Sequence, residues 1–156
     1  MDRFSIIAVK TSLIWMVAGI GMGSLMLVDH LVPGDWRAWF QPTHGHILFV
    51  GWFVQFVIGI AFWLLPRKRV PELPLGYGEH KAFIALSMLN LGLAFRVIAE
   101  PAWRSRVDGG WVDWLLSASS ILQFVAIVIF VTQMWPRIYG RNKLGTPPAK
   151  KTSDAT

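Results

Sequence analysis

The sequence contains no cysteine, and only 15% of its 156 residues are charged. The first absence excludes disulfides, thiolate metal sites, iron–sulfur clusters and covalently attached c-type haem. The second is unusual for a domain that has to stay in solution, since 54% of the residues are hydrophobic. A lipid bilayer is therefore the expected solvent for most of this chain.

Long uncharged runs predict four membrane-spanning segments. Residues 11–28, 47–65 and 114–135 carry no charge, and the length of each run is close to the roughly 20 residues needed to cross a hydrocarbon core. A fourth run, 82–99, is interrupted only by Arg96 near its end. Backbone groups in hydrocarbon have to be hydrogen-bonded internally, so we predict an all-α integral membrane protein, an antiparallel four-helix bundle. The predicted helices cover about 6–32, 44–65, 80–100 and 111–136.

The two ends of the chain are predicted to differ from these spans. Beyond residue 138 the sequence is polar and has no helical periodicity, so 139–156 is predicted to be a disordered tail outside the four-span domain of residues 1–138. A cleaved signal peptide is the alternative for the first span, but no small-residue cleavage pattern follows Val28. We therefore expect the first span to remain as a helix.

The distribution of Lys and Arg predicts the direction of the helices. An even number of spans places both termini on one side, and that side receives most of the 15 basic residues. They are Arg3, Lys10, Arg67, Lys68, Arg69, Lys81, Arg137, Arg141, Lys143, Lys150 and Lys151. Arg37, Arg104 and Arg106 lie on the opposite side. Both termini are predicted to be cytoplasmic, and the net charge of +6 reflects topology and not a nucleic-acid partner.

Histidines carry the candidate chemistry, because imidazole is the side chain here best suited to bind a metal ion or haem. His30 ends the first predicted helix, and His44 and His46 begin the second. All three are therefore expected at the outer membrane face, close to one another. Asp29 and Glu100 are expected in the same layer.

Helical geometry predicts which way these histidines point. With Thr43 as the N-cap of the second helix, His44 and His46 lie about 200° apart around its axis and face different neighbours. A side-by-side chelate of one ion by this pair is not expected. The fourth histidine, His80, is expected alone on the cytoplasmic side and has no assigned role.

Small and polar residues mark the faces that are expected to point into the bundle. On the first helix, a spacing of four, three and four aligns Gly19, Gly23, Met26 and His30. Such a stripe suits either close packing of a neighbouring helix or the approach of a flat cofactor. On the second helix, helical spacing aligns His44, Gly51, Gln55 and Ile58.

The third helix carries polar groups at two depths. Asn90 is expected inside the membrane, and Arg96 is expected to form an i,i+4 pair with Glu100 near the outer surface. This is either a structural ion pair, or Arg96, together with Arg37, neutralises carboxylates of a bound ligand such as haem propionates.

The second predicted helix resembles that of a known family. Residues 42–52, Pro-Thr-His-Gly-His-Ile-Leu-Phe-Val-Gly-Trp, and 59–67, Gly-Ile-Ala-Phe-Trp-Leu-Leu-Pro-Arg, are similar to the second helix of haem–copper oxidase subunit I. They are more similar to short four-helix membrane proteins described as subunit-I-like, which residues 90–101 also resemble. In the oxidases this helix begins at the outer face with a histidine that ligates the low-spin haem.

The resemblance implies a haem-b-binding or electron-transfer-associated subunit in the cell inner (plasma) membrane. One axial ligand would come from His44 or His46, and the other from His30 or from a second copy of the chain. The implied partners are the lipid bilayer and either a homodimer partner or other respiratory-chain membrane subunits. The remaining haem and copper ligands of a full subunit I are missing, so oxygen reduction by this chain alone is not expected.

Two other functions are compatible with the same residues. A copper, zinc or iron ion at the outer face would use His30, His44 and His46 with a carboxylate from Asp29 or Glu100, and would suit metal sensing or handling. Alternatively, an accessory or assembly protein retains an oxidase-like helix and binds no cofactor. The sequence has no nucleophile–base arrangement and no Gly-rich phosphate loop, so no catalytic residue is predicted.

The predicted orientation can be tested with a reporter enzyme that is active only outside the cytoplasm. Fused after Thr156, the reporter is expected to be silent in intact cells, because basic residues are retained on the cytoplasmic side. Activity at this position would reverse the orientation and would move the histidines to the cytoplasmic face.

Overall fold

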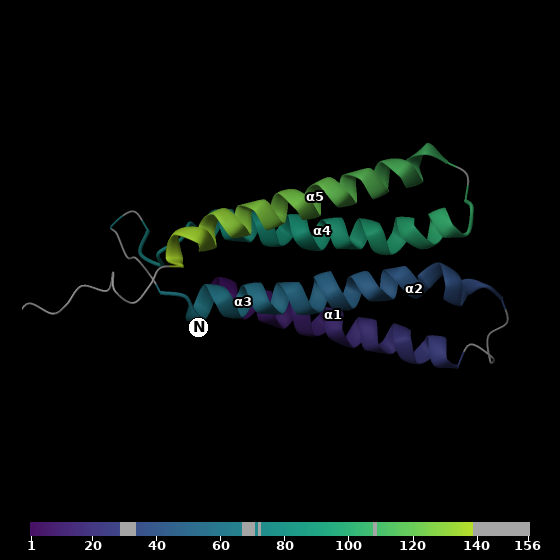
Figure 1. Ribbon diagram of the computed structural model, residues 1–156, viewed down its shortest axis with the longest axis horizontal. Helices are drawn as coiled ribbons and strands as arrows, with labels where there is room; N and C mark the ends of the chain where they lie inside the picture. The colour runs from purple at the N-terminus through teal and green to yellow at the C-terminus, as the bar shows by residue number, and fades with distance from the viewer. Residues whose placement is uncertain (29–33, 67–70, 72, 108, 139–156) are drawn as a thin grey trace, which may run out of the picture.

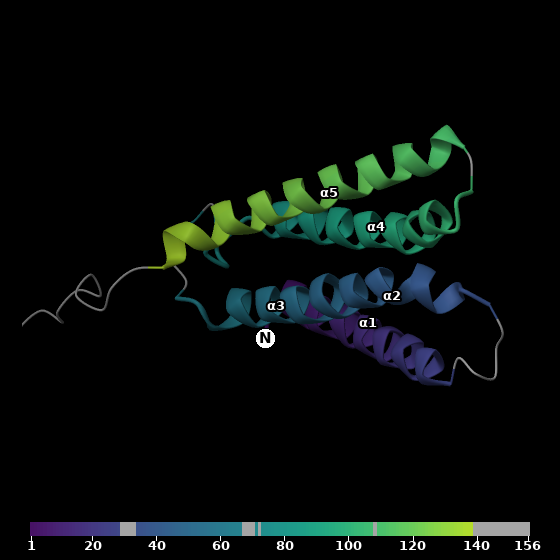
Figure 2. The same cartoon turned by 45° about the vertical axis from the view of Figure 1, so that its right-hand side comes forward.

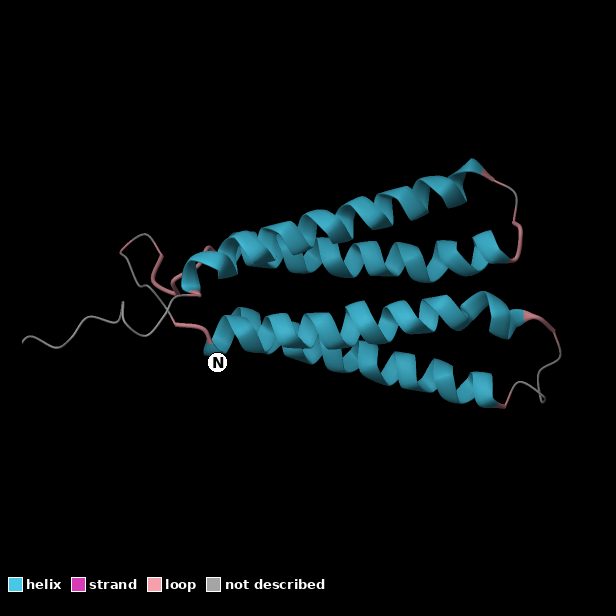
Figure 3. Cartoon of the chain, viewed as in Figure 1, coloured by secondary structure: helices cyan, strands magenta, loops and turns pink. Residues whose placement is uncertain are grey.

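The computed structural model describes residues 1–28, 34–66, 71, 73–107 and 109–138, and every regular element in this part of the chain is a helix (Figure 3). In chain order the elements are α1 (Arg3–Leu27), α2 (Trp36–His46), the π-helix η2 (Ile47–Val54), α3 (Gln55–Leu64), α4 (Glu79–Arg104), α5 (Gly110–Met134) and the 3-10 helix η3 (Trp135–Arg137). Because α2, η2 and α3 are continuous, these elements form four long helices. The predicted all-α class is confirmed for the described residues, and each long helix is long and apolar enough to cross a membrane.

The four long helices form two pairs (Figures 1 and 2). In one pair α1 lies against η2 and α3, and in the other α4 lies against α5. The pairs meet chiefly where α2 contacts α4. One end of the molecule, here named the termini end, holds Arg3, Leu64, Glu79 and Arg137, and the opposite end, here named the histidine end, holds Leu27, Trp36, Arg104 and Gly110.

The second long helix begins at Trp36, eight residues before the predicted start. Thr43 is therefore not an N-cap, and that prediction is wrong. It lies inside α2, is fully buried, and donates its hydroxyl hydrogen to Glu100. Pro42 precedes it within the same helix, although proline has no N–H to donate. Contacts with α4 stabilise this turn, and such contacts are not visible in the local sequence.

The π-helix η2 keeps one face of the second helix turned toward the bundle. From residue 43 to residue 55, buried residues recur every four positions, at Thr43, Ile47, Gly51 and Gln55. In a regular α-helix each step of four residues rotates the face by about 40°, so these four residues would spread over roughly 120°. The wider i→i+5 turns of a π-helix reduce that rotation.

The other helix ends fall near their predicted positions. α1 begins at Arg3 because Asp2 caps it, its carboxylate accepting a hydrogen bond from the Ser5 N–H at 2.8 Å. α4 continues four residues past its predicted end, through Pro101 to Arg104. The predicted end of the first helix and the predicted tail, 139–156, lie outside the described residues.

Glycines allow α1 and the second helix to approach closely. A Cβ atom added to Gly19 would lie 2.5 Å from the side chain of Leu48, and one on Gly23 would lie 2.8 Å from the ring of His44. Small residues at such contacts are typical of helix packing in membranes. At these two glycines, the small-residue stripe predicted on α1 therefore packs against side chains of the second helix.

A chain of hydrogen bonds links the two helix pairs midway along their length. The indole N–H of Trp15 donates to Asn90 Oδ1 at 2.7 Å, and Asn90 Nδ2 donates to Gln55 Oε1 at 3.0 Å. Gln55 Nε2 in turn donates to the carbonyl oxygen of Ala8 at 3.2 Å. These bonds satisfy polar groups that lipid cannot hydrogen-bond. The inward position predicted for Gln55 is confirmed, and Asn90 bonds to it from α4.

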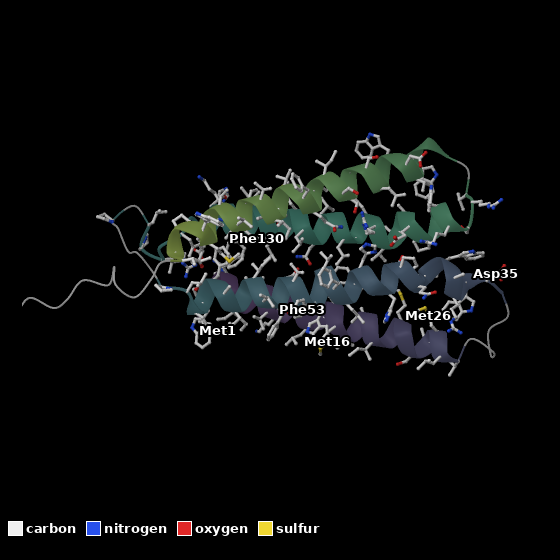
Figure 4. All side chains as sticks on the ribbon, viewed as in Figure 1. Met1, Met16, Met26, Asp35, Phe53 and Phe130 are labelled. Atoms are coloured by element: carbon white, nitrogen blue, oxygen red, sulfur yellow. The ribbon has the colours of Figure 1, made fainter. Side chains whose placement is uncertain are left out.

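Aromatic rings from α1, α3 and α5 pack at the termini end, where Figure 4 labels Phe130. The ring centroids of Phe4, Phe62 and Phe130 lie 4.8 to 6.1 Å apart, and Tyr77 packs edge-on against Phe62. Arg137 is 1% exposed, and its guanidinium lies 5.5 Å from the Phe62 centroid. It donates hydrogen bonds to the carbonyl oxygens at the end of α3, which caps that helix.

Candidate functional site

Two histidines of α2 point toward different neighbouring helices, as their spacing predicts. His44 lies against α1, where its ring packs on Gly23. His46 lies against α4, beside Arg96 and Glu100. Both belong to the last turn of α2, immediately before η2. They therefore occupy two separate chemical environments.

His46 has hydrogen-bond partners at both ring nitrogens. Its Nδ1 lies 2.9 Å from the carbonyl oxygen of Pro42 and 3.2 Å from Glu100 Oε2, and its Nε2 lies 2.9 Å from Arg96 Nη1. Arginine can only donate, so Nε2 accepts and Nδ1 carries the proton that is donated to the two oxygens. In this arrangement the imidazole is neutral, and Arg96 uses the lone pair of Nε2.

The side chain of His46 also stands between Arg96 and Glu100. The sequence predicts a direct ion pair between these two residues of α4, but Glu100 Oε2 accepts hydrogen bonds from His46 and, at 3.1 Å, from the hydroxyl of Thr43. Arg96 directs its guanidinium to His46 and to α5. The predicted direct pair is therefore wrong, because the imidazole from α2 separates the two charges.

The guanidinium of Arg96 connects this cluster to α5. Its Nη2 donates to the hydroxyl oxygen of Ser120 at 3.0 Å, and its Nε donates to that of Ser119 at 3.4 Å. Gln123 donates to the same Ser119 oxygen at 3.1 Å. The planar fork of arginine allows bonds to α2 and α5 at the same time. The His46 network comprises Thr43, His46, Arg96, Glu100, Ser119, Ser120 and Gln123.

Sequence reasoning misses the members of this network that come from α5. The available signal is a run of small residues, 117–120, of which three are serines, with Gln123 following inside an otherwise apolar span. Such serines also bond their own helix backbone, as Ser120 does with the carbonyl oxygen of Leu116 at 3.0 Å. The sequence alone does not show that this face of α5 meets Arg96.

One ring nitrogen of His44 is engaged, and the other makes no hydrogen bond within the described part of the chain. Nδ1 lies 2.9 Å from the carbonyl oxygen of Gly19. A carbonyl only accepts, so Nδ1 carries the proton and Nε2 keeps its lone pair. A backbone carbonyl bonded to one ring nitrogen is the usual way in which proteins orient a histidine whose other nitrogen binds a metal or haem iron.

The predicted metal site is not assembled by the described residues. Among them, no three His, Asp or Glu side chains converge closely enough to hold an ion. His44 and His46 face different helices, and Glu100 is bonded to the second of them. Asp29 and His30, the other predicted ligands, lie outside the described residues.

The remaining predicted residues lie elsewhere in the molecule. Arg37 is in the first turn of α2, about 10 Å along the helix axis from His44. It lines a surface hollow of about 390 Å³ together with Asp35 and Gln41. His80 is exposed in the first turn of α4, at the termini end. The described structure thus brings neither residue to His44 or His46.

Comparison with known protein families, with curated proteins and with solved structures gives no match for this chain. Function is therefore inferred from the residues of the site.

Replacing Arg96 by Lys is expected to destabilise the protein by about 1–2 kcal/mol, because an ammonium group cannot reproduce the planar fork that bonds His46, Ser119 and Ser120. The midpoint of thermal unfolding in mild detergent should fall accordingly. Arg104→Lys is the matched control, since Arg104 is an exposed arginine of the same helix, and it should leave the midpoint unchanged. Equal midpoints for the two variants would mean that the planar fork of Arg96 contributes nothing to stability.

Proposed function

We propose that the chain is a multi-pass protein of the cell inner (plasma) membrane, with four antiparallel spans and both termini cytoplasmic. The four long apolar helices support the membrane location. The excess of Lys and Arg on the side that holds both termini supports the orientation. In this orientation His44 and His46 lie toward the outer leaflet, and the bilayer surrounds the helices.

We infer that His44 is an axial ligand of one b-type haem, in a subunit associated with electron transfer. The hydrogen bond from His44 Nδ1 to the Gly19 carbonyl carries this inference, because it leaves the lone pair of Nε2 unused. The resemblance of residues 42–52 to the haem-ligating helix of the oxidases supports a ligand in this segment, at His44 or His46. A haem bound there supplies one-electron chemistry, and the protein contributes the ligand and its orientation.

Among the described residues, His44 is the one axial ligand that we propose for such a haem. His46 is not the second, because its Nε2 already accepts a hydrogen bond from Arg96. None of five surface hollows of 380 to 590 Å³ in the described structure is lined by either histidine. The second ligand is therefore assigned to His30 or to a second copy of the chain. Arg96 uses three of its five N–H donors, so it retains donors for a propionate carboxylate.

An accessory or assembly protein that binds no cofactor is the second candidate. The His46 network favours it, because Arg96, His46 and Glu100 satisfy one another without a ligand. In this function the histidine joins helices and takes no part in electron transfer. A copper, zinc or iron site is supported less, since it depends on Asp29 and His30 to complete its ligands.

Reduced-minus-oxidised absorption spectra of the protein in mild detergent separate these functions. His44→Ala is expected to lose the haem absorption, because it removes the Nε2 ligand. His46→Ala should retain the absorption while lowering the midpoint of thermal unfolding. His80→Ala, at the opposite end of the molecule, should change neither.

Haem absorption that persists in folded His44→Ala would contradict the assignment of this ligand. A wild-type protein that has no haem absorption, and no copper, zinc or iron by elemental analysis, would support the accessory function instead.

A further inference from the structure

A cavity of about 380 Å³ lies at the termini end of the molecule, opposite to the His46 network. Its wall combines apolar groups, such as those of Leu73 and Pro136, with the polar side chains of Tyr77, Lys81 and Gln133. The proposed haem site uses none of these residues.

The amide of Gln133 is the unexplained group in this wall. Its Nε2 and Oε1 are both buried, and within the described chain neither has a hydrogen-bond partner. Oε1 lies beside the start of α4, 3.4 Å from the position that a Cβ atom on Gly78 would take. An unsatisfied buried amide costs free energy, and a bound group that completed its hydrogen bonds would remove that cost.

Two further features of the wall favour a negatively charged ligand. Lys81 is exposed at the cavity, and its ammonium is a phosphate-binding group. Gly78 is the N-cap of α4 and offers no side-chain acceptor, so the partial positive charge of this helix start lies at the cavity wall. Glu79 brings an opposing charge to the same turn, but it does not line the cavity.

The cavity wall is partly apolar, and the cavity lies at the end of the four long apolar helices, so a lipid is the expected source of the negative charge. A phosphate at the end of four membrane spans is most abundant as a lipid headgroup, and basic pockets between membrane helices on the cytoplasmic side bind anionic headgroups. We propose that the cavity holds the phosphate headgroup of an anionic phospholipid, contacted by Lys81, the start of α4 and the amide of Gln133. This proposal rests on the membrane location proposed above and is independent of haem binding.

Thermal unfolding of the full chain in neutral detergent micelles tests the proposal. Phosphatidylglycerol added to the micelles should raise the unfolding midpoint by roughly 5 °C more than the same amount of phosphatidylcholine, because a ligand of the folded state stabilises it. Lys81→Glu is expected to abolish this difference. Lys10→Glu, the same change at an exposed lysine of α1 that does not line the cavity, should preserve it.

The variant Gln133→Leu separates a ligand contact from an amide that is merely unsatisfied. Loss of the response to phosphatidylglycerol in this variant would support the proposal. Higher stability without lipid, together with a wild-type response to phosphatidylglycerol, would overturn it. Lys81 is exposed, so Lys81→Glu decides the question even where Gln133→Leu does not fold.

Further additions to the micelles distinguish the possible sources of the phosphate, and solubility without detergent tests the membrane location. Equal stabilisation by phosphatidylcholine, or by inorganic phosphate without lipid, would overturn the assignment to an anionic phospholipid. A protein that stays in solution without detergent would instead contradict the membrane location. None of these measurements depends on haem absorption, so the lipid site and the haem site are tested independently of each other.

Discussion

The His46 network joins three helices at the end of the molecule where the two helix pairs meet most closely: the imidazole of His46 links α2 to α4, and Arg96 links α4 to α5. In a bilayer, apolar helix surfaces gain little from contacting one another, because lipid tails solvate them equally well. Helix association then depends on close packing at glycines and on hydrogen bonds between helices. The His46 network provides such bonds at the histidine end, Asn90 and Gln55 provide them midway, and Arg137 caps α3 at the termini end.

Two histidines that are two residues apart in sequence therefore have different chemistry. His46 has committed both ring nitrogens, and its loss would leave the guanidinium of Arg96 and the carboxylate of Glu100 without the group that separates them. His44 has committed only Nδ1, to the backbone of α1, and its Nε2 keeps a lone pair. This asymmetry is the basis for assigning the structural role to His46 and the ligand role to His44.

The parts of this structure that the sequence predicts are those that depend on local geometry. Apolar length predicts the four long helices, and helical periodicity predicts both the inward position of Gln55 and the divergence of the two histidines. The parts that it misses depend on tertiary contacts. The second helix begins early because Thr43 is buried against α4, and Arg96 does not pair with Glu100 because an imidazole from another helix lies between them. Neither partner can be read from a single helix.

The ring tautomer of His46 tests this interpretation most directly. It can be measured from the ¹⁵N NMR signals of the imidazole nitrogens in protein with labelled histidine, using His46→Asn to assign the resonances. We predict a neutral ring with the proton on Nδ1 and a hydrogen-bonded Nε2, whose signal changes in Arg96→Lys. A doubly protonated ring, or a proton on Nε2, would contradict the central claim that Arg96 donates to His46.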